Sequence, residues 1–265
     1  MIWLEIIVLA IVQGVGEFLP ISSSGHVVVG SALFKQFGHG IDETLTVNIV
    51  LHLGTLLAIL VFYWRRILAL LGRDRRTIPL LIVGSIPAAV VGIAIKKTAI
   101  GDTLEPLLEN PLLAGAMFPL TGLLLLLSAR HEPGETTCRE LRYTDALLIG
   151  VAQAFAILPG ISRSGTTIVA GLFRGMRRDE AATFSFLLAI PAIGGAGLLQ
   201  VLELVEHGPG STPWGALAVG AAVAFGVGLA ALVWLVRWLE QGWLYRFAWY
   251  VIPLGAIVIV WQTLA

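Results

Sequence analysis

The chain has 265 residues, of which 57% are apolar and only 13% are charged, and its 17 basic residues balance 17 acidic ones. A soluble domain carries about 25% charged residues, so a surface with half that share must face lipid rather than water. The even charge balance excludes a strongly basic or acidic binding surface, such as that of a nucleic-acid-binding protein. The single cysteine, Cys138, excludes a disulfide framework and a cysteine-ligated metal site. The composition therefore predicts an integral membrane protein.

Six continuous apolar stretches are long enough to cross a membrane, which takes about 20 residues. Two further apolar stretches, 2–19 and 144–158, run into clusters of Ser, Gly and Pro and resume as short apolar helices at 25–35 and 165–173. We interpret both as re-entrant helical hairpins that reach mid-membrane and return to the same side. The predicted fold is an all-α membrane domain over 1–265. Its six transmembrane helices are expected at 44–63, 78–95, 112–128, 180–203, 214–236 and 243–264.

Positive charge is distributed unevenly over the loops of this layout. Thirteen arginines fall on one side of the membrane and three lysines on the other. Because cytoplasmic loops carry an excess of Lys and Arg, the bias predicts that both termini lie outside. The arginines are Arg65, Arg66, Arg73, Arg75, Arg76, Arg130, Arg139, Arg142, Arg174, Arg177, Arg178, Arg237 and Arg246, and the lysines are Lys35, Lys96 and Lys97.

The two hairpins resemble each other in sequence. Each is followed by three spans, and because three is odd, the second copy enters the membrane from the opposite face. This predicts an inverted-topology repeat, with repeat one at 1–128 (hairpin 1–36) and repeat two at 144–265 (hairpin 144–173). Such repeats are usual in transporters. Chance similarity between two Ser- and Gly-rich breaks is the alternative. The matches at a spacing of 140 residues are Gln13 with Gln153, Ser22 with Ser162, Ser24 with Ser164, and Gly25 with Gly165.

The two breaks carry the residues expected at an anion site. In each, a proline (Pro20 or Pro159) ends one helix and a serine run supplies N-cap oxygens for the next. Free backbone N–H groups and the positive end of the helix dipole then point into the break. Inversion would bring the two helix N-termini together. The guanidinium of Arg163 can donate two parallel hydrogen bonds to phosphate oxygens. The predicted ligand is phosphate or diphosphate.

Each ionisable residue at membrane depth is by default a functional candidate, although a structural role is open for each. Arg163 could be a cap on the hairpin, and Glu17 could form a structural ion pair with it. His26 could be a hydrogen-bonded packing residue, and Ser23 could be a helix cap rather than a nucleophile. On a later span, Asn48 and His52 share one helix face, where hydrogen bonding between helices is slightly favoured over facing the cavity.

These residues lie within motifs by which the chain resembles a known family. The chain resembles the bacterial undecaprenyl-diphosphate phosphatase family of BacA-type membrane enzymes, and the resemblance covers essentially the whole chain. The motifs are Gln13-x-x-x-Glu17-Phe18-Leu19-Pro20-Ile21-Ser22-Ser23-Ser24-Gly25-His26, Leu51-His52-Leu53-Gly54, Pro159-Gly160-Ile161-Ser162-Arg163-Ser164-Gly165 and Phe184-Ser185-Phe186-Leu187-Leu188-Ala189-Ile190-Pro191.

The resemblance implies removal of the terminal phosphate from undecaprenyl diphosphate, which recycles the lipid carrier of cell-wall synthesis in the bacterial inner membrane and is linked to bacitracin resistance. It also implies dependence on a divalent metal, Mg²⁺ or Ca²⁺, with Glu17 as the protein ligand, and an active site towards the outer face. The implied catalytic residues are Glu17, Ser23, His26 and Arg163. The residues expected to contact substrate are Gln13, Ser22, Ser24, Gly25, Gln153, Ser162, Ser164, Gly165 and Thr167.

One departure from the family pattern concerns the metal. Members often have a second glutamate where this chain has Gln13. Glutamine is also seen there, so the departure is compatible with activity. It leaves one carboxylate rather than two, which weakens the case for a metal held by a pair of glutamates.

Two mechanisms and two further functions stay open at this point. Ser23 attacks the terminal phosphorus while His26 or Glu17 takes its proton, or His26 activates water directly. A polyprenyl-phosphate flippase or anion transporter would use the same inverted-repeat site, and a purely structural or receptor role ranks last. The expected partners are a polyprenyl diphosphate and membrane lipids, without nucleic acid. The oligomeric state, the prenyl-length preference and any lipid flipping remain open.

Overall fold

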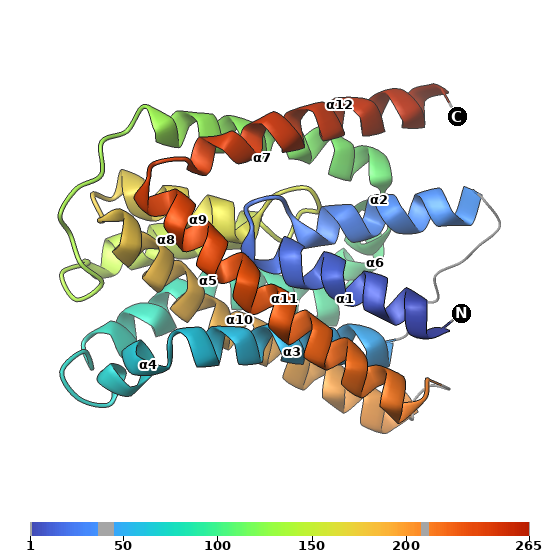
Figure 1. Ribbon diagram of the computed structural model, residues 1–265, viewed down its shortest axis with the longest axis horizontal. Helices are drawn as coiled ribbons and strands as arrows, with labels where there is room; N and C mark the ends of the chain where they lie inside the picture. Colours follow the sequence, from blue (N-terminus) through green and yellow to red (C-terminus); the bar gives the residue numbers. More distant parts are fainter. Residues whose placement is uncertain (1, 37–44, 208–211, 265) are drawn as a thin grey trace.

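The computed structural model describes residues 2–36, 45–207 and 212–264, and within these ranges every regular element is a helix. The predicted all-α fold is confirmed. Figure 1 shows the helices lying roughly along one long axis. They are α1 (Ile2–Phe18), α2 (Ser23–Gln36), α3 (Leu45–Phe62), α4 (Trp64–Leu70), α5 (Thr77–Lys97), α6 (Ala99–Leu108), α7 (Pro111–Ala129), α8 (Tyr143–Phe155), α9 (Arg163–Phe173), α10 (Arg178–His207), α11 (Trp214–Glu240), the short 3-10 helix η1 (Leu244–Phe247) and α12 (Ala248–Leu264).

Five helical segments in the described part of the chain are long and apolar enough to cross a membrane. They lie in α5, α7, α10, α11 and η1 with α12, which correspond to five of the six predicted spans. The sixth corresponds to α3 and α4, which bend by 74° at a break and count as a span only when taken as one unit. Its predicted start at 44 lies outside the described residues. Helix α6, which contains Asp102, Glu105 and Pro106, was not predicted, because its charges interrupt the apolar pattern.

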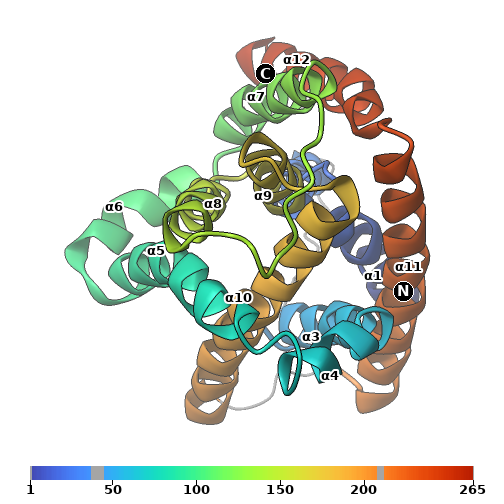
Figure 2. The ribbon, with the colours of Figure 1, turned by 90° about the vertical axis from the view of Figure 1, so that its left-hand side faces the viewer.

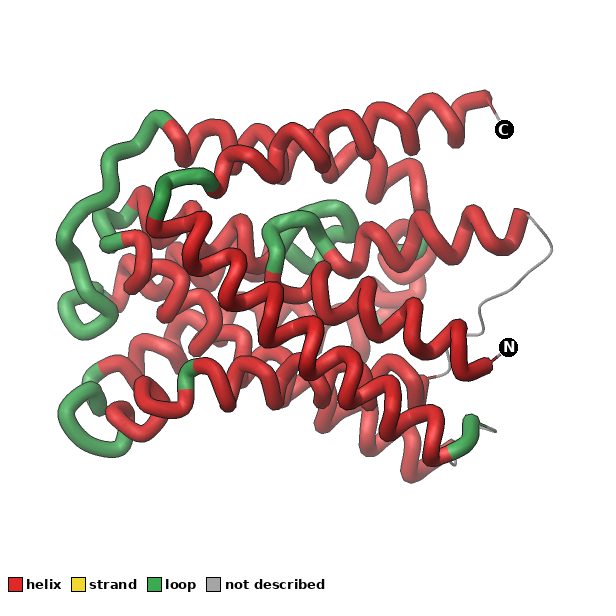
Figure 3. Tube along the Cα trace, in the orientation of Figure 1, coloured by secondary structure: helices red, strands yellow, loops and turns green. Residues whose placement is uncertain are grey.

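The two predicted hairpins are present as pairs of short helices. Helices α1 and α2 have 17 and 14 residues, and α8 and α9 have 13 and 11. All are shorter than the about 20 residues that a span needs. Figure 1 and Figure 3 show that α1–α2 turns back at mid-length of the bundle from the end with the termini, whereas α8–α9 does so from the opposite end.

Helix packing follows a reciprocal pattern between the two halves of the chain. Helix α1 packs against α11, and α8 packs against α5; α7 lies against α12 and α3 against α10. The end view in Figure 2 shows α9 near the centre of the bundle, between α7 and α10. If α1, α3, α5 and α7 correspond to α8, α10, α11 and α12, the α1–α11 contact corresponds to the α8–α5 contact. The α7–α12 and α3–α10 contacts each join a helix to its own counterpart. An internal two-fold repeat would produce this pattern.

The loops that carry the arginines gather at one end of the bundle. In Figure 1 the α3–α5, α7–α8, α9–α10 and α11–η1 connections lie at the left, and the termini lie at the right. Buried Glu180 joins two of these loops to α10, because it pairs with Arg66 and accepts a hydrogen bond from the Cys138 amide at 2.8 Å. The described residues thus form a multi-pass membrane bundle with one strongly basic end.

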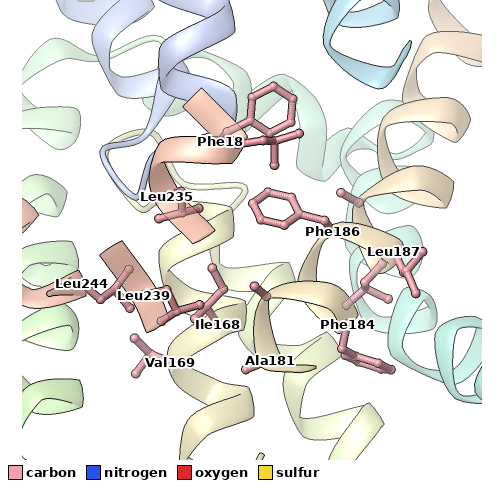
Figure 4. Packing of buried hydrophobic residues seen from close by; sticks show 14 of the residues in the cluster. Phe18, Ile168, Val169, Ala181, Phe184, Phe186, Leu187, Leu235, Leu239 and Leu244 are labelled. Carbon is pink, nitrogen blue, oxygen red and sulfur yellow. The ribbon is translucent and has the colours of Figure 1, made fainter. Parts of the chain in front are cut away.

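Aromatic packing fixes the end of α1, where the first hairpin turns. Phe18 is fully buried, and its ring centroid lies 5.8 Å from that of Phe186 on α10. Figure 4 shows the two rings next to each other, near side chains of α9 and α11. The Phe18 ring also fills the space above Gly228 of α11, where an added Cβ would come within 2.5 Å of it. Because Glu17 precedes Phe18, this packing positions the Glu17 carboxylate.

Close backbone contact between the two breaks gives the first prediction. A Cβ on Gly25 would lie 2.7 Å from the Gly160 nitrogen, whereas one on Gly30 would meet nothing within 4 Å. We expect Gly25→Ala to lower the free energy of unfolding by about 1–3 kcal/mol through overpacking. Gly30→Ala is the control and should be neutral or stabilising, because alanine favours helix. Thermal unfolding in detergent measures both, and equal midpoints would contradict this packing.

Candidate functional site

The two interrupted helices are joined directly by hydrogen bonds across the breaks. The Ser22 hydroxyl oxygen accepts from the Gly160 amide at 3.1 Å. In the other direction, the Ser164 hydroxyl donates to the Leu19 carbonyl oxygen at 3.3 Å. The breaks around 22–26 and 159–165, predicted to meet, are therefore in contact.

Both returning helices are capped in the same way. Ser22 Oγ accepts from the Gly25 amide at 3.3 Å, and Ser162 Oγ accepts from the Gly165 amide at 3.2 Å. Each capping hydroxyl also pairs with the serine two residues on, at 3.4 Å for Ser24 and at 3.2 Å for the equivalent Ser164. A side-chain cap satisfies one of the free N–H groups at a helix start and leaves the others available to a ligand.

The backbone at the first cap is strained. Ser22 has a φ of 69°, a left-handed conformation that non-glycine residues rarely adopt and that costs about 1–3 kcal/mol. The Ser22 hydroxyl accepts amide hydrogen bonds from both breaks, and these contacts offset the strain. Such strain is concentrated in proteins at functional sites.

An ion pair with two further hydrogen bonds lies between the helix ends. Arg163 Nη2 is 2.6 Å from Glu17 Oε1, and the two side chains are 16% and 9% exposed. The second carboxylate oxygen, Oε2, accepts from Ser23 Oγ at 3.3 Å and from Gln13 Nε2 at 3.2 Å. The cluster thus contains a guanidinium, a carboxylate that can receive a proton, and a serine hydroxyl that donates to that carboxylate.

A cavity of about 200 Å³ opens onto this cluster, and we call it the polar pocket. Its chemistry combines the positive ends of two helices with hydroxyl donors and one cation, which favours a multiply charged anion. One carboxylate within reach of a hydroxyl supplies a base for nucleophilic attack. The polar lining residues are Glu17, Ser22, Ser23, Ser24, His52, Ser162 and Arg163.

His26 is oriented away from this cluster by two hydrogen bonds. Its Nδ1 lies 2.7 Å from the Ser22 carbonyl oxygen and its Nε2 lies 2.8 Å from the Tyr250 hydroxyl. Because a carbonyl only accepts, Nδ1 carries the proton and Nε2 accepts from Tyr250. The imidazole also stacks on the Tyr250 ring with centroids 5.7 Å apart. Sequence reasoning missed Tyr250, because nothing distinguishes this aromatic residue from an interfacial anchor of the last span.

Several residues predicted to contact substrate also have structural contacts at the breaks or lie outside the polar pocket, and their contact with substrate stays a prediction. Thr167 Oγ1 donates to the Arg163 carbonyl oxygen at 2.8 Å and pairs with Ser185 Oγ at 2.6 Å, so it stabilises the first turn of α9. Gly25 and Gly165 provide close packing between the breaks, since a Cβ on Gly165 would lie 3.0 Å from Pro20. Gln153 is buried, and it lines a different cavity from the polar pocket.

Two polar residues on spanning helices complete the site. Thr121 of α7 accepts from the Ser162 amide at 3.0 Å and donates to the Gly160 carbonyl at 2.7 Å, a role that a lone threonine in an apolar stretch does not indicate. His52 lines the polar pocket, and its Nδ1 lies 2.9 Å from the Asn48 carbonyl oxygen of its own helix. His52 therefore faces the cavity, which was the slightly less favoured of the two predicted roles.

The residues present fit a metal that arrives with a substrate better than a resident metal. Within the described ranges, no group of three or more His, Cys, Asp or Glu side chains could hold an ion. Glu17 is the acidic side chain of the polar pocket, and Gln13 adds an amide beside it. Mg²⁺ is commonly bound by one or two carboxylates together with substrate phosphates, and Glu17 meets that requirement.

Comparison with known proteins identifies the family. The family model described as "Bacitracin resistance protein BacA" matches residues 6–257. The chain belongs to the BacA family. A relative from Rhodopirellula baltica, named undecaprenyl-diphosphatase, is 49% identical over 97% of both chains. BacA-family relatives from Bacillus cereus, named undecaprenyl-diphosphatase 3, and Moorella thermoacetica, named undecaprenyl-diphosphatase, are each 39% identical. They cover 98% and 97% of this chain and 97% and 96% of their own. The family resemblance predicted from the motifs is confirmed.

Substitution of Ser22 separates its hydrogen bonds from its strain. Ser22→Ala removes the acceptor for two buried amides and keeps the positive φ, so we expect it to cost about 1–3 kcal/mol of unfolding free energy. Ser22→Gly loses the same acceptor but relieves the strain, and it should be about 1 kcal/mol more stable than the alanine variant. Ser31→Ala, further along α2 and outside the polar pocket, is the control. A Ser22→Ala variant as stable as wild type would contradict the role of the Ser22 hydroxyl as acceptor for the two amides.

Proposed function

We propose that the chain hydrolyses undecaprenyl diphosphate to undecaprenyl phosphate and inorganic phosphate. The observation that carries the proposal is the Glu17–Arg163–Ser23 cluster between two helix N-termini. The chain belongs to the BacA family, and its relatives from Rhodopirellula baltica and Bacillus cereus are named undecaprenyl-diphosphatase and undecaprenyl-diphosphatase 3. Such an enzyme recycles the lipid carrier of cell-wall synthesis, and this activity accounts for the bacitracin resistance in the family's name.

Binding of the diphosphate depends on positive charge that is already in place. Arg163 and the first-turn amides of α2 and α9 offer donors to the phosphoryl oxygens, and they need not reorganise during the reaction. Preorganised donors of this kind are usually the largest contribution to catalysis, at about 10²–10³ in rate for one donor. The Arg163 contact also neutralises Glu17, which would otherwise repel the anionic substrate.

The hydroxyl of Ser23 is the proposed nucleophile. As Ser23 Oγ bonds to the terminal phosphorus, its proton passes to Glu17, to which it already donates. The bond from that phosphorus to the bridging oxygen breaks, and undecaprenyl phosphate leaves. Water then attacks the phosphoserine, and release of inorganic phosphate restores Ser23. The contacts of His26 with Ser22 and Tyr250 favour a positioning role for it over direct activation of water.

A divalent cation, Mg²⁺ or Ca²⁺, is part of the proposal. Glu17, with the Gln13 amide beside it, would hold the ion, and a bound cation would neutralise charge on the phosphoryl oxygens. The Arg163 guanidinium would keep the carboxylate oriented towards the pocket.

The finer architecture is also proposed rather than observed. Six spans and two re-entrant hairpins form an inverted repeat, supported by the reciprocal helix pairings and the matched serine caps. The arginine-rich end is cytoplasmic by the positive-inside rule, so the termini lie outside the bacterial inner membrane. The active site faces the outer side.

Transport of a lipid phosphate without chemistry is less favoured by the geometry. A carrier needs a clamp for the anion but has no use for a serine that donates to a buried carboxylate. The hydrogen bond from Ser23 to Glu17 at 3.3 Å therefore favours a hydrolase.

Phosphate release tests the proposed reaction. The purified protein, supplied with undecaprenyl diphosphate and Mg²⁺, should release inorganic phosphate, and EDTA should abolish the release. Glu17→Gln keeps the shape of the side chain but removes the base, so kcat should fall by about 10²–10⁴. Wild type that releases no phosphate would contradict the proposed function.

The roles of Ser23 as nucleophile and of Arg163 as phosphate ligand can be tested separately. Ser23→Ala should lower kcat by about 10²-fold or more, whereas Ser31→Ala, on the same helix but outside the polar pocket, should leave it within about twofold. Arg163→Lys keeps the charge but loses the bidentate fork, and it should cost about 10²-fold in kcat/KM. Normal turnover by Ser23→Ala would exclude the covalent route and leave direct attack by water.

A further inference from the structure

A second cavity lies next to the polar pocket. It has a volume of about 380 Å³, and because Ala156 and Arg163 line both cavities, the two are neighbours. We call it the α5–α10 groove. Its walls are mostly small side chains, among them Ala88, Ala89 and Gly92 of α5 and Ala192, Gly195 and Ala196 of α10.

The groove is open to the surroundings of the bundle. Ala89, Gly195 and Ala196 are exposed, so the space between α5 and α10 is open at its edge. Ser85, Ala89 and Pro191 also line a third cavity of about 410 Å³, which contains otherwise apolar side chains. The two cavities therefore adjoin along α5 and α10, and apart from Ser85, Lys96, Gln153 and Arg163 their lining is apolar. In a membrane protein, such a space faces lipid.

The inner end of the groove contains polar atoms that have no partner. Gln153 is 3% exposed, and neither its Oε1 nor its Nε2 has a hydrogen-bond partner among the residues that the structure describes. The same is true of Arg163 Nη1, whereas Nη2 is bound to Glu17. An unsatisfied buried polar group is costly. Two unpartnered donors, Gln153 Nε2 and Arg163 Nη1, at the head of a mostly apolar space therefore indicate a ligand with an anionic head and an apolar chain.

We propose that the substrate lies across Arg163. The terminal phosphate occupies the polar pocket, and the lipid-linked phosphate is hydrogen-bonded by Gln153 and by Nη1 of Arg163. The first isoprene units fill the α5–α10 groove, and the rest of the prenyl chain passes between α5 and α10 into the bilayer. This inference rests on the proposed function, and it adds the orientation of the substrate and a binding role for the groove.

Filling the groove tests the position of the prenyl chain. A Cβ on Gly92 or Gly195 would meet nothing within 4 Å, so Gly92→Leu and Gly195→Leu place a side chain in open space. With undecaprenyl diphosphate as substrate, each should raise KM about tenfold while kcat stays within about twofold. Gly194→Leu is the matched control, because Gly194 is equally open but does not line the groove, and its KM should equal that of wild type.

Substitution of Gln153 tests the second phosphate contact. Gln153→Leu removes two unsatisfied buried atoms, so its thermal midpoint should be equal to or higher than that of wild type. If Gln153 binds the lipid-linked phosphate, KM for undecaprenyl diphosphate should nevertheless rise about tenfold. A purely structural glutamine would leave KM unchanged.

The outcomes separate this inference from the proposed function. Wild type that releases no phosphate overturns both. Active wild type, with unchanged KM in Gly92→Leu, Gly195→Leu and Gln153→Leu, overturns the inference alone. A lower kcat with unchanged KM in these variants also overturns it, because the leucine side chains would then affect the chemical step and not substrate binding.

Discussion

The rest of the structure depends on one constraint, which is that two interrupted helices meet inside a bundle with little access to water. Each interruption exposes backbone N–H and C=O groups that lipid cannot satisfy. Serine caps, Thr121 and the hydrogen bonds from one break to the other satisfy several of them. The N–H groups that remain at the two helix starts carry partial positive charge. The same feature that makes the breaks costly therefore makes them suitable for an anion.

The Glu17–Arg163 ion pair forms because the two breaks meet, and it also holds them together. Breaking a buried pair from one side leaves an uncompensated charge, at a cost of about 3–5 kcal/mol, so the two breaks cannot separate freely. Ser23 and Gln13 add donors to the same carboxylate. A structural role for the pair and a catalytic one are compatible, because an anionic substrate can compete with Glu17 for the guanidinium.

Sequence patterns predicted the all-α membrane fold, the two pairs of short helices and the meeting of the breaks, because these follow from apolar length, Ser-Gly-Pro clusters and a repeat spacing. They did not predict the bend between α3 and α4 or the short helix α6. Roles that depend on packing between distant helices also escaped prediction. Tyr250 beside His26, Thr121 beside Ser162 and the orientation of His26 come from side chains more than thirty residues apart. The functions of the predicted site residues follow from the motifs.

The most direct test of the central claim is an experimental structure of the protein with inorganic diphosphate bound. The account predicts a bound anion between the first turns of α2 and α9, with the Arg163 guanidinium and the serine hydroxyls as its partners. An anion bound elsewhere, with Arg163 still engaged only by Glu17 and backbone carbonyls, would contradict the claim that the two helix ends form one anion pocket.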